Sequence, residues 1–449
     1  MNLVISMRGQ IKRLGLLLIL SLFIYLQPAS KTNPHLKVKE HKLGTLAPGY
    51  LEQLCFSKDG KRYAYVLKRG NFYSVVIDGK EGKKYKCVYQ PIFSDDGDKV
   101  AYIAFKGVSG NSPKWVVVVD GKEVGEYEEI YDPVFIPGSH KLAYGARDKG
   151  KWFAVIGERK EGRYDEFGTK NRCTHWKYSV IMLGRILSPT FSSDGRHYAY
   201  VAWKGEKGFV VVDGKKGRKY ANVWYPIFSP DGKRVAYSAS HNEDFEGEFM
   251  VIDGKRKEVY DEIGEYIFSP DSKSLAYTAS RKGKWFIVVN GMKGKEYETV
   301  REVVFSPDSK NVAYVAVLGE KKECIVLNGK EGKKYEYVSD IVFSPDGKRY
   351  VYGAYSFSSK KGWVVVDGRE IQARWSWWPR SPFLFSPDSK RLAYIIEIGQ
   401  GRQKKKAVVV DGLKSRGYDE VYNLSFIDND KLFFNALDHK TILRVEMEI

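Results

Sequence analysis

Three tryptophans and an arginine lie close together in the segment ARWSWWPRSP (373–382). They are Trp375, Trp377, Trp378 and Arg380. Aromatic rings bind sugar rings, nucleobases or peptide segments by stacking, and an arginine adds a positive charge to such a surface. The segment is therefore a candidate ligand-binding site. The alternative is that the rings pack between neighbouring parts of the fold.

A second candidate is the segment GTKNRCTHWKYSVIMLGRILSPT (168–190), which carries four cations and no acid. Its candidate ligand-binding residues are Arg172, Trp176 and Lys177. Cations beside an aromatic ring suit an anionic or an aromatic ligand. The segment could be a binding loop or lid, or a packed decoration, because residues 180–183 are apolar.

Motifs for catalysis are missing from the sequence. It contains no G-x-S-x-G, H-E-x-x-H, P-loop or G-x-G-x-x-G string, which are the common signatures of hydrolases, metalloproteases and nucleotide-binding enzymes. The four cysteines show no C-x-x-C spacing, so a zinc site is not expected. The sequence predicts a non-catalytic protein without metal or cofactor. A disulfide between Cys55 and Cys87 remains an alternative in an exported protein.

A repeat must position these residues. The string F-S-P-D-G-K-R-x-A-Y returns about every 40 residues, a period typical of repeat architectures. Its first residue is Phe56, Phe93, Phe135, Phe191, Phe228, Phe268, Phe305, Phe343, Phe385 and Phe426. The copies at 135–144 and 426–434 are degenerate. A second string, of the type V-V-V-D-G-K, follows most copies.

Both strings predict turns between short strands. Ser-Pro-Asp-Gly favours a β-turn in which the Asp caps the backbone, and Asp-Gly favours a two-residue hairpin. The same capping role is expected for Asp231, Asp308 and Asp346. Each unit is then four antiparallel strands. In the unit of Phe228 the first strand ends at 226–229, and the others span 233–239, 249–253 and 258–263.

Ten such units predict an all-β fold, a β-propeller of about ten four-stranded blades. The repeated Phe and Ala-Tyr are expected to pack between blades. The string F-S-P-D-G-K-x-x-A-Y resembles the TolB-type propeller repeat, a relative of the WD-repeat propellers, over residues 50–449. It is also similar to the propeller of prolyl-oligopeptidase-like peptidases. The TolB-type resemblance implies protein–protein scaffolding at the cell envelope.

The two ends of the chain are expected to meet. The last unit offers only three strands (422–427, 431–436 and 443–448), and residues 36–43 could supply the fourth. Pairing of these segments would hide two sheet edges and close a single ring. Two five-bladed rings, with a junction near residue 264, are the alternative.

Residues 1–30 are expected to lie outside the propeller, which spans 31–449. A basic flank precedes the apolar residues 14–26, which are short for a membrane span and fit a secretion signal or a tether. A periplasmic or extracellular location follows. Lys and Arg number 74 against 55 Asp and Glu, which suits loose attraction to acidic proteins, anionic lipid or an anionic envelope polysaccharide. The even spread of these cations does not favour a specific nucleic-acid site.

The sequence therefore predicts an exported propeller that binds a protein partner at the cell envelope. The variable face, formed by the loops between second and third strands and by the connections between blades, is where binding is expected. A glycan-binding or lyase-type propeller that uses the Trp cluster at the channel mouth is the first alternative. A regulatory propeller related to peptidases, without their hydrolase domain, is the second.

Overall fold

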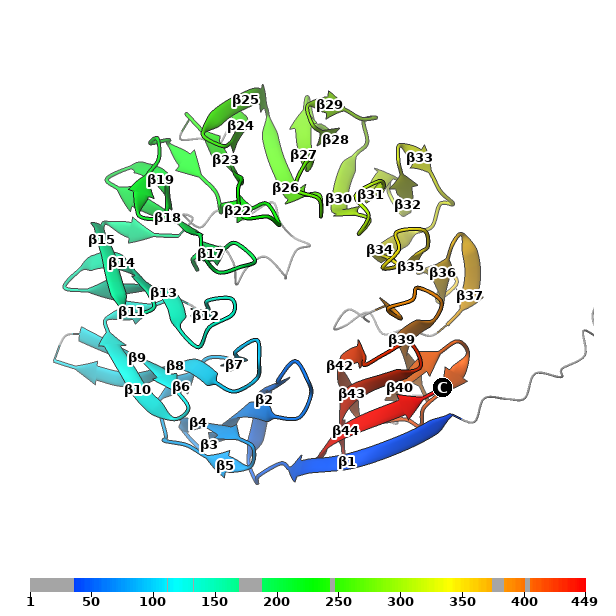
Figure 1. Cartoon of the computed structure of the whole chain (residues 1–449), viewed down its shortest axis with the longest axis horizontal. Coiled ribbons are helices and arrows are strands. Elements are labelled where there is room, and N and C mark those ends of the chain that lie inside the picture. The colour runs from blue at the N-terminus through cyan, green and yellow to red at the C-terminus, as the bar shows by residue number, and fades with distance from the viewer. Residues whose placement is uncertain are drawn as a thin grey trace, which may run out of the picture. The chain divides into compact units, whose positions relative to one another are not determined.

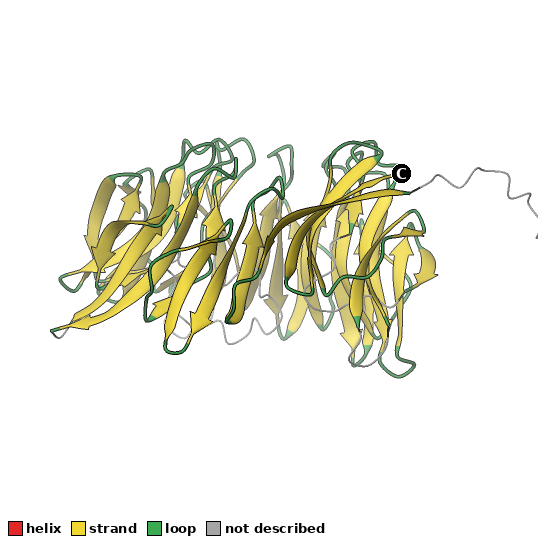
Figure 2. Cartoon of the chain, turned by 90° about the horizontal axis from the view of Figure 1, so that it is seen from below, coloured by secondary structure: helices red, strands yellow, loops and turns green. Residues whose placement is uncertain are grey.

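The computed structural model describes residues 36–110, 112–131, 133–168, 188–242, 247–373, 383–399 and 404–449. These residues form strands and turns and contain no helix, so no helix among them could cross a membrane. In the compact unit Val38–Met447, ten small antiparallel sheets stand side by side in a ring around one central axis (Figure 1). Seen edge-on, their strands run between two opposite faces (Figure 2). The prediction of one ten-bladed propeller is confirmed, and the two-ring alternative is wrong.

Six blades are four-stranded sheets. Blade 1 is β2 Tyr50–Phe56, β3 Tyr63–Arg69, β4 Phe72–Ile77 and β5 Lys80–Glu81; blade 6 is β26 Glu262–Phe268, β27 Leu275–Arg281, β28 Lys284–Val289 and β29 Met292–Lys293; blade 7 is β30 Thr299–Phe305, β31 Val312–Gly319, β32 Lys322–Leu327 and β33 Lys330–Glu331. Blade 8 is β34 Tyr337–Phe343, β35 Tyr350–Ser356, β36 Lys361–Val366 and β37 Arg369–Gln372; blade 9 is β38 Leu384–Phe385, β39 Leu392–Ile398, β40 Lys405–Val410 and β41 Leu413–Lys414; blade 10 is β42 Glu420–Phe426, β43 Lys431–Asp438, β44 Thr441–Glu448 and β1 Lys37–Thr45.

In the other four blades the innermost strand is in two pieces, which was not predicted. Blade 2 is β6 Cys87–Val88, β7 Ile92–Phe93, β8 Val100–Ser109, β9 Ser112–Val119 and β10 Lys122–Tyr127; blade 3 is β11 Glu129–Ile130, β12 Val134–Phe135, β13 Leu142–Asp148, β14 Lys151–Ile156 and β15 Arg159–Tyr164. Blade 4 is β16 Glu166–Phe167, β17 Thr190–Phe191, β18 Tyr198–Lys204, β19 Lys207–Val212 and β20 Lys215–Lys216; blade 5 is β21 Asn222–Val223, β22 Ile227–Phe228, β23 Val235–Ser240, β24 Glu248–Ile252 and β25 Lys255–Tyr260.

Proline explains the split. Two residues before the repeated Phe, these four blades carry Pro91, Pro133, Pro189 and Pro226. A proline has no N–H to donate to the neighbouring strand, so pairing stops there. Blades 1, 6, 7, 8 and 10 have another residue at this position and keep one strand with a bulge.

The strands of blade 5 match the prediction except for the last. Asp253 and Gly254 form a two-residue hairpin with φ of 51° and 75°, as Asp-Gly turns favour. The fourth strand therefore begins directly after it and ends at Tyr260, not at residue 263. Residue 263 belongs to β26, the inner strand of the next blade.

The arginine that follows the first turn ties blades 1, 5, 8 and 9 to the next blade. Asp346 accepts hydrogen bonds from Ser344 Oγ at 2.6 Å and from the Lys348 amide at 3.1 Å, and Asp231 and Asp308 make the same contacts. Arg349 Nε bonds Asp367 at 3.0 Å, and its Nη1 donates to two carbonyls of the turn in blade 9, at 3.2 and 2.9 Å. The predicted capping role of these Asp residues is confirmed.

Apolar cores lie between the blades, as predicted. The core between blades 4 and 5 includes Val201 and Trp203 from one side and Tyr237 and Ala239 from the other, all buried. The Tyr of the Ala-Tyr string is buried in nine blades, at Tyr65, Tyr102, Tyr144, Tyr200, Tyr237, Tyr277, Tyr314, Tyr352 and Tyr394. The burial of these tyrosines between blades explains why the Tyr recurs in each repeat.

The N-terminal strand closes the ring. β1 pairs with β44 as the outermost strand of blade 10 (Figure 1), and the Leu46 amide donates to the Lys440 carbonyl at 2.8 Å. Leu43 and Leu46 then pack with Ile442 and with the tyrosines of blade 1. The predicted pairing of residues 36–43 with the last unit is confirmed.

Candidate functional site

The ring has two faces of different chemistry. The turn face carries the Ser-Pro-Asp-Gly and Asp-Gly turns. An arginine joins the two turns in blades 1, 5, 8 and 9, as Arg234 joins Asp253 at 3.1 Å, and a lysine or a histidine joins them in blades 2 and 4. The loop face lies at the other strand ends and carries the hairpins between the second and third strands and the connections between blades. The turn face is nearly the same in each blade, whereas the loop face varies in sequence and length.

The residues singled out from the sequence lie outside the described part of the chain. Trp375, Trp377, Trp378 and Arg380 fall in 374–382, and Arg172, Trp176 and Lys177 fall in 169–187. The second segment was expected between two blades. It instead joins β16 to β17, which both pair with β18, so it interrupts the inner strand of blade 4.

An acid in the connection fixes most loop-face hairpins. Glu336, directly after the outer Tyr335, accepts hydrogen bonds from the amides of Phe357 and Ser358 in the next blade, at 2.6 and 3.0 Å. The equivalent acids Glu128, Asp165, Asp261 and Asp419 also accept an amide of the next hairpin. The carboxylate satisfies backbone donors that a tight hairpin leaves open, and so keeps these hairpins short.

In two of the described junctions another residue stands in place of this acid, and the hairpins that follow these two are long. Lys86 and Ala221 stand at its position. After Lys86, the hairpin of blade 2 extends to strands of ten and eight residues. After Ala221, the hairpin of blade 5 leaves 241–247 between Ser240 and Glu248. The loop face therefore departs from the repeat at blades 2 and 5.

An aromatic cluster lies at the base of the long hairpin of blade 2. The ring of Tyr89 stacks on Trp115 with centroids 5.5 Å apart, and Phe105 lies 4.8 Å from the same indole. Tyr89 is 46% exposed, and Val108 near the hairpin tip is 66% exposed. The Lys86 ammonium adds a charge 4.6 Å from the ring of Phe72. This aromatic cluster (Tyr89, Phe105 and Trp115) is a partly open apolar surface.

In other blades, different pairs of residues occupy the positions of Tyr89 and Trp115. In blade 3 the corresponding pair, Tyr131 and Trp152, stacks at 4.3 Å with Trp152 buried. In blade 7 the pair is Arg301 and Glu323, an ion pair at 2.6 Å. Sequence reasoning missed Tyr89 and Trp115. The signal that could have found them is their fixed distance from the repeated Phe and Asp-Gly.

Carboxylates near the channel tie blades together. Glu265 accepts the Val303 amide of the next blade at 3.2 Å, and Glu302 accepts the Asp340 amide at 2.9 Å. Burial raises the pKa of Glu265. Burial also raises the pKa of Glu323, although Arg301 opposes this shift. These contacts explain the acids as structural hydrogen-bond acceptors.

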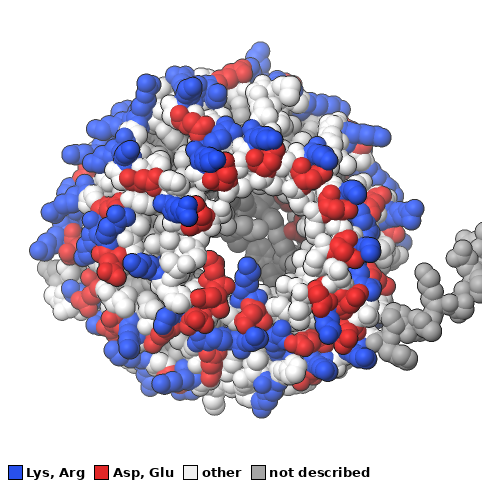
Figure 3. Space-filling view, viewed as in Figure 1, with Lys and Arg blue, Asp and Glu red and all other residues white. Residues whose placement is uncertain are grey.

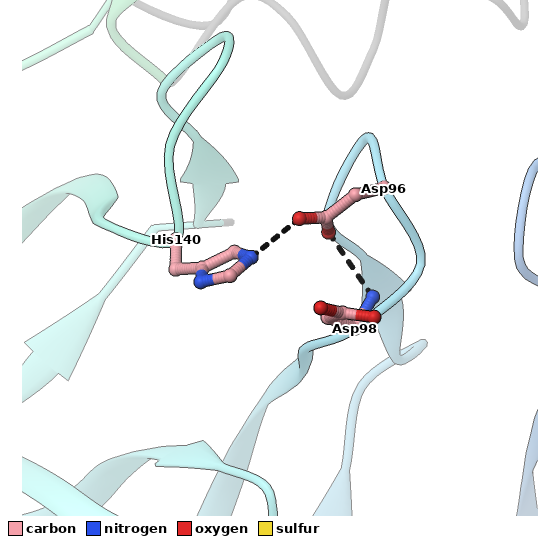
Figure 4. Close-up of side chains that lie close together, drawn as sticks. All are labelled: Asp96, Asp98 and His140. Carbon is pink, nitrogen blue, oxygen red and sulfur yellow. Dashed lines mark hydrogen bonds and ion pairs between the residues drawn. The ribbon is translucent and has the colours of Figure 1, made fainter.

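Asp96, Asp98 and His140 meet on the turn face between blades 2 and 3 (Figure 4). Their ligating atoms lie within 4.8 Å of one another, and all three residues are exposed. His140 Nε2 is 2.5 Å from Asp96 Oδ2. Bonds from the Ser94 hydroxyl, the Asp98 amide and His140 hold the pKa of Asp96 well below its usual range.

Comparison with the other blades indicates that this cluster is a contact that joins blades 2 and 3. Blade 2 has Lys99 where Arg349 stands in blade 8, and Lys99 bonds Asp120 of its own blade at 2.9 Å. Lysine cannot reach two further acceptors as an arginine does. The contact between His140 and Asp96 joins blades 2 and 3 in its place.

Cys55, Cys87 and Cys324 are free thiols. Cys55 donates to the carbonyls of Ala64 and Pro91 at 3.4 and 3.2 Å, and burial raises its pKa to about 12. The alternative of a disulfide between Cys55 and Cys87 is not found.

No protein-family model matches the chain, and no curated protein matches it. A crystal structure of the eukaryotic initiation factor is 13% identical, with 84% of this chain and 91% of that chain covered and a TM-score of 0.45. The tricorn protease is 16% identical, with 87% and 43% covered and a TM-score of 0.28. The β-propeller domain of Cps50 (Swd1) from Myceliophteria thermophila is 11% identical, with 62% and 96% covered and a TM-score of 0.28. At these values the likenesses say nothing about function.

Proposed function

We propose that the protein is a non-catalytic, exported β-propeller that binds a partner protein on its loop face. The observation that carries this proposal is the aromatic cluster of blade 2, where Tyr89 lies 46% exposed on Trp115. Aromatic residues are enriched at protein interfaces, where a rigid ring loses little entropy on binding. The long hairpin of blade 2 adds the exposed apolar side chain of Val108 beside it.

The location at the cell envelope rests on the sequence. The apolar residues 14–26 behind a basic flank support export. The resemblance of the F-S-P-D-G-K-x-x-A-Y string to the TolB-type repeat supports a scaffold role there. In this proposal any contact with the membrane is made by the N-terminal segment alone.

A photo-crosslinking residue at position 108 tests the loop face in cells of the host. We expect a discrete crosslinked protein from position 108 and none from position 233, an exposed site on the turn face. A second measurement uses the exposed Tyr89. In the variant Tyr89→Ala the crosslink from position 108 should be lost, and the Tm should not change. Equal crosslinking from both positions would contradict the proposal. Crosslinking that is lost on addition of a neutral oligosaccharide would favour the glycan-binding alternative.

A further inference from the structure

One position of the outer strand divides the ring into two sectors. It is the residue paired with the Val that lies two positions before the two-residue turn between the third and fourth strands, and we name it the clasp position. It carries an acid in blades 1, 2, 7 and 8, as Glu81, Glu123, Glu331 and Glu370. It carries a cation in the consecutive blades 3 to 6 and in blade 9, as Lys160, Lys216, Arg256, Lys293 and Lys414.

Acidic clasps neutralise the cations around them. Glu370 accepts the Tyr335 hydroxyl of the preceding blade and the Lys333 ammonium, both at 2.7 Å. Glu123 makes the same pair of contacts with blade 1, at 3.5 and 3.2 Å. In this sector the lysines of the outer strands are therefore partly compensated.

Cationic clasps lie over aromatic rings instead. Lys160 Nζ is 5.0 Å from the ring of Tyr127, and Lys216 Nζ is 5.6 Å from the ring of Tyr164. Arg256 lies 4.3 Å from the ring of Phe249. Lys293 lies 4.1 Å from the ring of Phe286 and also pairs with Glu296 at 2.6 Å. Packing on a ring restricts each side chain while its charge stays at the surface. Four successive blades thus carry one held cation each, and those of blades 3 to 5 have no carboxylate partner in the described ranges.

Further cations lie near the clasp residues of blades 3 to 6. Arg163, Lys215, Arg218, Lys219, Lys255 and Lys257 are exposed, and none of the six forms an ion pair with a carboxylate in the described ranges. The nearby carboxylates Asp213, Asp253 and Glu258 are bonded to His197, Arg234 and Arg281. Lys and Arg gather along the outer edge near β15 and β25 (Figure 3). We call this sector the basic rim.

We propose that the basic rim binds a flexible, linear anionic polysaccharide. Regularly spaced charges on a convex edge fit a chain that can follow the curve of the ring. Duplex DNA is stiff over about 150 base pairs and would contact only part of such an edge. Single-stranded nucleic acid needs open rings for stacking, whereas the rings of Tyr164, Phe249 and Phe286 are buried. The site is separate from the loop face and so goes beyond the proposed function.

Charge reversal at two clasps tests the proposal. The variant Lys216→Glu/Arg256→Glu introduces the residue that blades 2, 7 and 8 carry at this position, so it should fold with an unchanged Tm. The matched control, Lys84→Glu/Lys122→Glu, makes the same change in net charge on the rim of blades 1 and 2. The probe is sulfated dextran, with neutral dextran of equal length beside it.

We expect the clasp variant to raise the Kd for sulfated dextran by about tenfold or more at about 0.15 M salt, and the control to change it by less than about threefold. Neutral dextran should not bind, and Tyr89→Ala should bind sulfated dextran as the wild type does. Equal losses in the two charge variants would show attraction by net charge alone and overturn the proposal. Tighter binding of duplex DNA than of sulfated dextran would overturn the choice of polymer.

Discussion

Tyr418 donates a 2.7 Å hydrogen bond from its hydroxyl to Glu40, 378 residues away in the sequence. Arg416 holds the same carboxylate with bonds of 2.7 and 3.0 Å. Tyr335 bonds Glu370 in the same way between blades 8 and 7, at 2.7 Å. The ring is therefore closed with the help of the same contact that joins neighbouring blades elsewhere.

Glu40→Ala should weaken the closure of the ring. Loss of a charged acceptor from a partly exposed contact is expected to lower the free energy of unfolding by about 1–2 kcal/mol. Hydrogen exchange of the β1 amides should become faster. Glu370→Ala is the matched control, because it removes the same contact inside the ring and should leave β1 protected. Unchanged protection of β1 in Glu40→Ala would show that the strand pairing alone closes the ring.

The fold could be read from the sequence because its signals are local. Each Ser-Pro-Asp-Gly and Asp-Gly string specifies a turn from adjacent residues, and the regular spacing then gives the blades. The missing fourth strand of the last unit predicted the role of residues 36–43. The split inner strands were also readable in Pro91 and its equivalents, although the repeat alone did not reveal them.

The aromatic cluster and the basic rim could not be predicted from the sequence in this way. Tyr89 lies between β6 and β7 and Trp115 lies in β9, and only the order of the strands in the sheet brings them together. The charge of the rim depends on which residue pairs with a given Val, because Lys216 and Glu370 are equivalent only in register. A count of charges along the sequence gave an even spread for this reason, whereas the structure shows cations at the clasp position of the consecutive blades 3 to 6.

Glu336→Ala should release the hairpin of blade 8. Its carboxylate accepts the amides of Phe357 and Ser358, and each lost bond should favour local opening by about 1 kcal/mol. Hydrogen exchange of these two amides is expected to become several-fold faster, whereas the Tm changes little. Glu298→Ala is the control, because that acid bonds the Lys284 ammonium at 2.6 Å instead. Unchanged exchange at Phe357 would contradict the capping role.

Arg349→Lys should loosen the junction between blades 8 and 9. A lysine can keep the bond to Asp367 but cannot also reach both carbonyls of the next turn, since it lacks the planar fork of arginine. The free energy of unfolding is expected to fall by about 1–2 kcal/mol, measured by urea denaturation. The neighbouring Lys348, 81% exposed in its side chain, provides the control: Lys348→Ala should change stability by less than about 0.5 kcal/mol. Equal effects of the two variants would contradict the role of Arg349 in joining blades 8 and 9.

Glu248→Gln should flatten the dependence of stability on pH. Glu248 is buried and accepts the Ile263 amide at 2.8 Å, and burial raises its pKa to about 8 from 4.5, with the nearby Glu262 adding to the shift. Among the described residues no cation pairs with it, unlike Glu323, which has Arg301. The folded state thus keeps a proton that the unfolded state loses above pH 4.5. Its stabilising effect is complete below that pH and is lost as the pH rises towards about 8.

Between these two pH values the free energy of unfolding should fall by about 1.4 kcal/mol per pH unit through this group. Glutamine still offers an oxygen to the Ile263 amide but does not titrate, so the variant should lose this slope and exceed the wild type in stability near pH 8. Urea denaturation at a series of pH values measures both. Glu206→Gln, at an exposed hairpin residue of blade 4, should keep the slope of the wild type. A Glu248→Gln variant with that same slope would show that the buried carboxyl is not the group that titrates.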